Sequence, residues 1–199
     1  YMNTSKILDG PSFSCHNNPK KLIFMLHGYG DNAENFIKIT NPFDIKSWKI
    51  NYYSLNASSL VNQLPNGRQW FELYPNGIHI ADAGPNEINI IKQQILDSIK
   101  LIENTINKIR QYFNLNHEDC FLLGFSQGGM MAFEYANFVK KSLAGLVILS
   151  GRVLTEEKIT NQAFLKTPIF FSFSYRFQIV FVCVGWLDAL PAPGWRQAE

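Results

Sequence analysis

Cysteine is scarce in this chain of 199 residues. The three cysteines, Cys15, Cys120 and Cys183, lie in unrelated sequence contexts and show no paired spacing. An odd number of cysteines without such spacing argues against a disulfide framework and a zinc site, and it is typical of a reducing compartment. Residues 1–15 also lack the apolar core of a signal peptide, so we expect a cytoplasmic protein without a metal.

An excess of charge of either sign is absent as well. The chain has 18 Lys and Arg against 16 Asp and Glu, and its basic residues are scattered rather than gathered in a stripe. A nucleic-acid-binding domain is expected to carry a basic patch, so we predict no nucleic-acid partner. The length and an apolar content of 46% suit one globular domain with a sizeable core.

The most informative stretch is residues 119–131, DCFLLGFSQGGMM. Its apolar run at 120–123 predicts a short strand that is buried on both faces. Residues 124–128 then match the Gly-x-Ser-x-Gly nucleophile elbow, in which a sharp strand-to-helix corner presents a serine, here Ser126. A side chain at either glycine would collide with a neighbouring element, and residues 129–136 can begin a helix whose free N–H groups favour developing negative charge. The alternative is a glycine-rich corner without chemistry.

A second motif follows the apolar run at residues 21–26, which predicts another buried strand. This run leads directly into His27-Gly28-Tyr29-Gly30. A strand that ends in His-Gly-x-Gly supplies one half of an oxyanion hole, and the residue after the nucleophile supplies the other half. We therefore predict the main-chain N–H groups of Tyr29 and Gln127 as the two donors. His27 is predicted to shape this loop rather than to act as a base.

The remaining pattern alternates strands with helices. Strands are predicted at residues 51–57 and 143–151, and another begins at 166–170. A long apolar stripe predicts a helix over residues 85–113, and a weaker helix is predicted over 156–164. This alternation predicts an α/β fold with a mostly parallel sheet, helices on both faces, and chemistry at the carboxyl ends of the strands.

The polar stretch at residues 65–73 is predicted to be a loop with exposed aromatic side chains. Trp70 and Phe71 either line a pocket for an acyl chain or anchor the loop on the core, and the sequence does not decide between these alternatives. His79 and His117 are interpreted as residues of a surface loop and of a connecting turn.

Together these stretches resemble the phospholipase/carboxylesterase family of α/β-hydrolases, which includes the acyl-protein thioesterases. The resemblance extends over residues 20–170 and implies a serine hydrolase of small-molecule carboxylic esters or thioesters that needs no metal or cofactor. It also implies Ser126 as the nucleophile, Tyr29 and Gln127 as oxyanion donors, and Trp70 as part of the substrate cleft. The matching segments are LHGYGDNAENF (26–36), LNA (55–57), GRQWFEL (67–73), GFSQGGMMAFEYA (124–136), LAGLVILSG (143–151) and KTPIF (166–170).

The resemblance ends where the family places its triad acid and then its histidine base. All four histidines of this chain precede Ser126. Residues 171–199 also contain no Asn and no Lys, although residues 1–170 contain 19 and 13 of them. We therefore predict an α/β-hydrolase domain over 1–170, incomplete in its C-terminal part, and a divergent tail over 171–199 that is not family sequence, so that the family's C-terminus is truncated or replaced. The activity is expected to be impaired by loss of the histidine; the alternative is a catalytically inactive remnant or an acyl-ligand-binding module.

Two further interpretations concern this tail. Asp188 is the only aspartate after Ser126, and it follows a strand-like run at residues 179–184, so it is the candidate acid. Residues 169–187 could instead cross a membrane, but Arg176 makes this a poor span, because an arginine at mid-span costs about 2.5 to 3.5 kcal/mol. We expect no stable span, and rather a damaged strand with exposed apolar surface that promotes aggregation.

Overall fold

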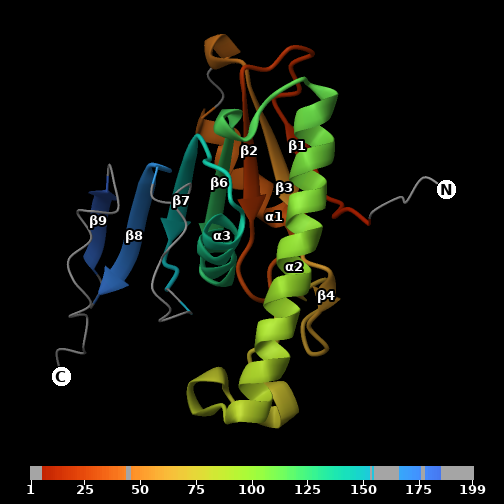
Figure 1. Cartoon of the computed structure of the whole chain (residues 1–199), viewed down its shortest axis with the longest axis vertical. Helices are drawn as coiled ribbons and strands as arrows, with labels where there is room; N and C mark the ends of the chain where they lie inside the picture. Colours follow the sequence, from red (N-terminus) through yellow and green to blue (C-terminus); the bar gives the residue numbers. More distant parts are fainter. Residues whose placement is uncertain (1–5, 44–45, 153, 155–165, 176–177, 185–199) are drawn as a thin grey trace.

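The computed structural model describes residues 6–43, 46–152, 154, 166–175 and 178–184. A seven-stranded sheet with the order β1-β3-β2-β6-β7-β8-β9 forms its centre (Figure 1). All neighbouring pairs from β3 to β8 are parallel, whereas β1 and β9 at the two edges run antiparallel to their neighbours. The strands are β1 (Ser12–Phe13), β2 (Lys21–Leu26), β3 (Ile50–Leu55), β6 (Cys120–Phe125), β7 (Gly145–Leu149), β8 (Ile169–Tyr175) and β9 (Gln178–Val184).

Helices flank this sheet, and a small hairpin of β4 (Ser59–Leu60) and β5 (Arg68–Gln69) lies outside it. The α-helices are α1 (Ala33–Phe36), α2 (Pro85–Tyr112) and α3 (Gln127–Phe138). The 3₁₀ helices are η1 (Ile37–Phe43), η2 (Lys46–Trp48), η3 (Pro75–Gly77), η4 (Ile80–Asp82) and η5 (His117–Asp119). The predicted long helix is confirmed: Pro85 takes the first turn of α2, and the chain leaves the helix through Asn114 at φ 53°.

Alternation along the strands divides the core into two layers. Leu22 and Phe24 of β2 belong to the main core, which also contains the buried isoleucines of α2 and the buried face of α3. Met25 points to the opposite face of the sheet, where it packs with Phe36 of α1 and Tyr52 of β3. The mostly parallel sheet with helices on both faces is therefore confirmed.

The C-terminal part of the chain is described only in part. β8 and β9 pair with each other from Ile169↔Val184 to Tyr175↔Gln178 and extend the sheet beyond β7. The stretch considered as a membrane span thus forms strands over most of its length. No helix in the described ranges is long and apolar enough to cross a membrane. The predicted helix at 156–164 and Asp188 lie outside the described residues, and the assignment of 171–199 as a divergent tail stays a prediction.

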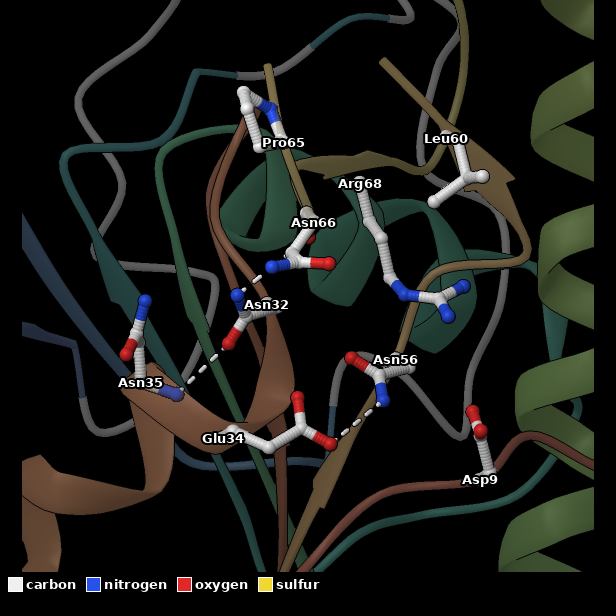
Figure 2. A pocket seen from close by; sticks show the side chains of 9 residues that line it. All are labelled: Asp9, Asn32, Glu34, Asn35, Asn56, Leu60, Pro65, Asn66 and Arg68. Carbon is white, nitrogen blue, oxygen red and sulfur yellow. Dashed lines mark hydrogen bonds between the residues drawn. The ribbon is translucent and has the colours of Figure 1, made fainter. Parts of the chain in front are cut away.

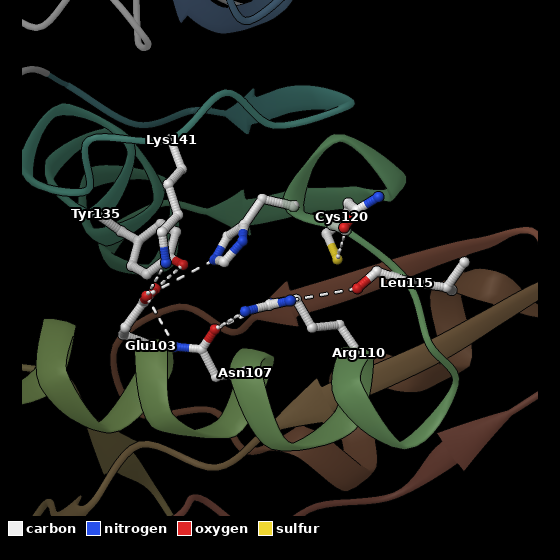
Figure 3. Close-up of polar contacts among 9 residues, drawn as sticks. Glu103, Asn107, Arg110, Leu115, Cys120, Tyr135 and Lys141 are labelled. Atoms are coloured by element: carbon white, nitrogen blue, oxygen red, sulfur yellow. Dashed lines mark hydrogen bonds and ion pairs between the residues drawn. The ribbon is translucent and has the colours of Figure 1, made fainter.

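A cluster of polar side chains joins α2 to α3 beside the main core (Figure 3). The carboxylate of Glu103 accepts hydrogen bonds from the Tyr135 hydroxyl and from Asn107 Nδ2, the latter at 2.8 Å. The Lys141 ammonium lies 3.6 Å and His117 Nε2 lies 3.7 Å from Glu103 Oε1. His117 lies in the connecting turn before β6, as interpreted from the sequence, but it is buried, because η5 places its ring against α2 rather than in solvent.

Replacing Glu103 by Gln is expected to lower the free energy of unfolding at pH 7 by about 2 kcal/mol, since a charged acceptor of two partly buried hydrogen bonds is lost. Burial raises the pKa of Glu103, but its contacts with His117, Tyr135 and Asn107 outweigh burial and lower it from 4.5 to about 2. The folded-state pKa lies below the unfolded one, so this stabilisation is complete above pH 4.5 and is lost as the pH falls toward 2.

Urea unfolding at pH 7 and at pH 3 measures this effect. The difference between wild type and Glu103→Gln should shrink at the lower pH. Glu118→Gln, which changes an exposed carboxylate nearby, should stay within about 0.5 kcal/mol of wild type at pH 7. Equal stability of wild type and Glu103→Gln at pH 7 would contradict the prediction.

Candidate active site

Ser126 lies at the corner between β6 and α3, where it is the N-cap residue of the helix. Its backbone has φ 49° and ψ −115°, which is a strained conformation for a residue with a side chain. The corner is held by hydrogen bonds from Ser126 N to Leu149 O at 2.8 Å and from Met130 N to Ser126 O at 3.0 Å. The predicted strand, corner and helix are therefore present, and the partly exposed serine stands at the N-terminus of α3.

The two glycines of the corner are required by close backbone contacts. A Cβ at Gly124 would lie 2.1 Å from the carbonyl oxygen of Gly128, inside the turn itself. A Cβ at Gly128 would lie 2.0 Å from the carbonyl oxygen of Leu26 and 2.5 Å from that of His27. The predicted collisions are confirmed, and α3 begins directly against the end of β2.

The 27–30 loop lies beside this corner. β2 and β6 are adjacent parallel strands paired at Leu26↔Gly124, so the segments that follow these two strands leave the sheet at the same edge. A Cβ at Gly28 would lie 3.1 Å from the ring of Phe125, which shows how closely the loop packs on the corner. Tyr29 and Gln127, the predicted oxyanion donors, thus belong to two segments that the sheet brings together.

His27 is buried, and both of its ring nitrogens have partners. Nε2 accepts a hydrogen bond from Ala57 N at 3.1 Å, so the ring proton is on Nδ1, which lies 2.7 Å from the carbonyl oxygen of Gly28. Burial lowers the pKa of His27, although the Gly28 carbonyl opposes this shift. A neutral imidazole with both nitrogens engaged shapes the loop, as predicted, and has no free lone pair to accept the serine proton.

The prediction that Trp70 and Phe71 are exposed is wrong. Their side chains are 2% and 1% exposed and belong to the main core. The indole Nε1 of Trp70 donates to the His27 carbonyl oxygen at 2.9 Å, and the two rings lie 5.3 Å apart. The Trp70 carbonyl oxygen accepts from Ser98 Oγ at 2.6 Å. The polar sequence suggested a solvated loop, but these hydrogen bonds allow the segment to fold inward.

The side chain of Gln127 makes two hydrogen bonds that the sequence did not predict. Gln127 is 1% exposed, and its Oε1 accepts from Trp70 N at 2.9 Å. Its Nε2 donates to the Phe71 carbonyl oxygen at 2.7 Å. A glutamine after the nucleophile indicated only a main-chain donor, because its side-chain partners lie 56 and 57 positions away in the sequence.

The other described histidines lie elsewhere. His16 is near the start of β3, where its main-chain N–H donates to Asn51 Oδ1 at 2.6 Å. His117 precedes the start of β6. Both are therefore at the amino ends of strands, opposite the corner. His79 caps η4 by accepting from Ala81 N at 3.2 Å. Within the part of the chain that the structure describes, no side chain hydrogen-bonds the Ser126 hydroxyl.

A polar cavity of about 510 Å³ opens near the carboxyl ends of β2 and β3 (Figure 2). Glu34 Oε1 accepts from Asn56 Nδ2 at 3.2 Å on one wall, and Arg68 forms part of another. Carboxylate, amide and guanidinium groups dominate the lining, so this cavity does not suit an acyl chain. The lining residues are Asp9, Asn32, Glu34, Asn35, Asn56, Leu60, Pro65, Asn66 and Arg68.

A family model described as Phospholipase/Carboxylesterase matches residues 13–186. This chain belongs to the phospholipase/carboxylesterase family. The family is one of serine carboxylesterases with the α/β-hydrolase fold, and its match to this chain continues past residue 170 into β8 and β9.

Individual relatives are distant. The chain is 24% identical over 152 residues to acyl-protein thioesterase 1 of Candida albicans, and the alignment covers 72% of this chain and 62% of the thioesterase. It therefore spans less than two thirds of that relative's length. Esterase PE8 superposes with a TM-score of 0.69 at 22% identity, covering 83% of this chain and 74% of the esterase. A phospholipase/carboxylesterase from Dyadobacter fermentans superposes with a TM-score of 0.59 at 19% identity, covering 84% and 73%. These structures show the α/β-hydrolase fold.

Proposed function

We propose that this chain is a serine hydrolase of carboxylic esters or thioesters, with Ser126 as its nucleophile. The observation that carries the proposal is the strained φ of 49° at Ser126, on a corner packed against the 27–30 loop. Strain of this kind is kept where it holds a reactive group in place, and here it presents a hydroxyl at the N-terminus of α3. Membership of the family supports the same reaction class.

In the proposed reaction, Ser126 Oγ attacks the acyl carbonyl carbon, and the main-chain N–H groups of Tyr29 and Gln127 donate to the oxyanion. The alcohol or thiol leaves, and water then hydrolyses the acyl-enzyme. The serine proton needs an acceptor during the attack, yet residues 127–199 contain no histidine, and His27 has both nitrogens engaged. We therefore propose that the reaction of this chain is slow. The scarcity of cysteine supports a cytoplasmic location as part of the proposal.

A second candidate function is an acyl-ligand-binding module without turnover, which is favoured because none of the four described histidines lies where it can accept the Ser126 proton. The two functions differ in whether Ser126 forms a covalent bond. Stoichiometric binding of a fatty-acyl ester without product release would support the binding module.

A fluorophosphonate probe tests the proposal directly, because it phosphonylates a nucleophilic serine. After long incubation, peptide mapping by mass spectrometry should find the phosphonyl group on Ser126 of the wild type, and Ser126→Ala should not be labelled. Ser59→Ala is a suitable control, since Ser59 is an exposed serine of β4, and it should be labelled as wild type is. Labelling of Ser126→Ala to the wild-type level would show that Ser126 is not the nucleophile.

A further inference from the structure

Residues 68–71 form a bridge between the 27–30 loop and the start of α3. At one end, Gly30 N donates to the Arg68 carbonyl oxygen and Arg68 N donates to the Asp31 carbonyl oxygen, each at 2.9 Å. The Trp70 indole donates to the His27 carbonyl oxygen, also at 2.9 Å. Three hydrogen bonds thus attach this segment to the loop that carries Tyr29.

The other end of the segment is held by one side chain. Gln127 accepts from Trp70 N at 2.9 Å and donates to the Phe71 carbonyl oxygen at 2.7 Å, so it pairs with the backbone as a neighbouring strand would. Its own backbone N–H is the second proposed oxyanion donor. All three residues are at most 2% exposed, so these bonds are shielded from competing water.

We propose that residues 68–71, named here the 68–71 brace, fix the separation of the Tyr29 and Gln127 N–H groups, and that Gln127 and Trp70 are positioning residues that act through it. The inference rests on the proposed function, because it assigns a purpose to the spacing of the two oxyanion donors. Oxyanion stabilisation depends on donors that are aligned before the reaction begins. A displacement of a catalytic group by about 1 Å can lower the reaction rate on the order of 10²-fold.

Alternative explanations of these contacts are weaker. Burial of Trp70 and Phe71 excludes direct contact with a substrate in this conformation. Anchoring the loop on the core accounts for the apolar rings that pack there, and it requires a partner for each buried polar group. It does not require that these partners come from the residue after Ser126 and from the loop that precedes Tyr29. The bonds connect the two donor segments, and this connection is what the brace explains.

The test compares Gln127→Met, Trp70→Phe and the double variant. Methionine keeps the volume and the backbone N–H of residue 127 but removes both side-chain bonds, and phenylalanine keeps a ring but removes the indole donor. With a small activated ester and added imidazole, each single variant should lower kcat by about tenfold with little change in KM. The double variant should fall no further than the more impaired single variant, because both changes release the same brace.

Gln94→Met is the matched control. Gln94 of α2 accepts a hydrogen bond from Glu72 N at 2.7 Å, and the substitution removes this more exposed bond just beyond the brace, without a link to either donor segment. It should leave kcat within about twofold of wild type. Equal kcat values for wild type and Gln127→Met, or losses that multiply in the double variant, would overturn the proposal.

Hydrogen exchange tests the brace without using activity. Amides of residues 28–31 should exchange faster in Gln127→Met relative to those of β2, which report overall stability, and Gln94→Met should show no such change. Unchanged relative exchange would overturn the brace even if kcat falls. If imidazole-supported hydrolysis does not depend on Ser126, the proposed function fails instead, and exchange alone decides the inference.

Discussion

Gly128→Ala is expected to destabilise the protein by about 4 kcal/mol or more, which is at the extreme of single substitutions. The added Cβ would lie 2.0 Å from the Leu26 carbonyl oxygen and 2.5 Å from the His27 carbonyl oxygen. Both neighbours are backbone atoms at the end of a central strand, so no side chain can rotate away. The start of α3 would have to separate from β2, and typical domains have only about 5 to 15 kcal/mol of stability in total.

Urea unfolding followed by circular dichroism measures this change. If too little folded variant can be purified, the yield of soluble protein is compared with that of wild type instead. Gly84→Ala is the control, because its Cβ would meet only the flexible end of Glu87, at 3.1 Å. It should remain within about 1 kcal/mol of wild type. A Gly128→Ala protein that unfolds at the same urea concentration as Gly84→Ala would show that the corner is more loosely packed than the structure indicates.

The elements around this corner could be predicted because their signals are local. The apolar run at 21–26 has the same bounds as β2, and the spacing of apolar residues over 85–113 predicted α2. The glycines at 124 and 128 indicated a turn too tight for side chains, and the distances from a Cβ at either position to neighbouring backbone atoms agree. These signals lie within single strands, helices or turns, although the clash at Gly128 itself is with the distant carbonyl of Leu26.

The features that the sequence did not reveal depend on distant partners. The inward position of Trp70 requires the carbonyl of His27 and the side chain of Gln127, which are 43 and 57 residues away. His117 similarly becomes buried because α2 places Glu103 opposite its ring. A polar segment favours solvent until such partners are known, so local pattern alone gave the wrong exposure for Trp70, and it left the burial of His117 unpredicted.

Imidazole is expected to increase Ser126-dependent hydrolysis of a small activated ester on the order of 10²-fold, the lower end of what a general base contributes. The reason is that the proton acceptor is the component that we predict this chain to lack. All four histidines precede Ser126, and in the described structure the ring of His27 is fully engaged in hydrogen bonds. A diffusible base can reach the partly exposed hydroxyl of Ser126 if the nucleophile and the oxyanion donors are in place.

The measurement compares wild type with Ser126→Ala over a series of imidazole concentrations, after the hydrolysis by imidazole alone is subtracted. Without imidazole the two proteins should differ little. In a serine triad, loss of the serine or of the histidine alone costs about as much as loss of all three members, and roughly 10³ to 10⁴ over water remains from binding and the oxyanion hole. With imidazole only the wild type should respond, which separates a working nucleophile from a passive cleft. Rapid Ser126-dependent turnover without imidazole would mean that the chain contains its own base, and the predicted impairment would then be wrong.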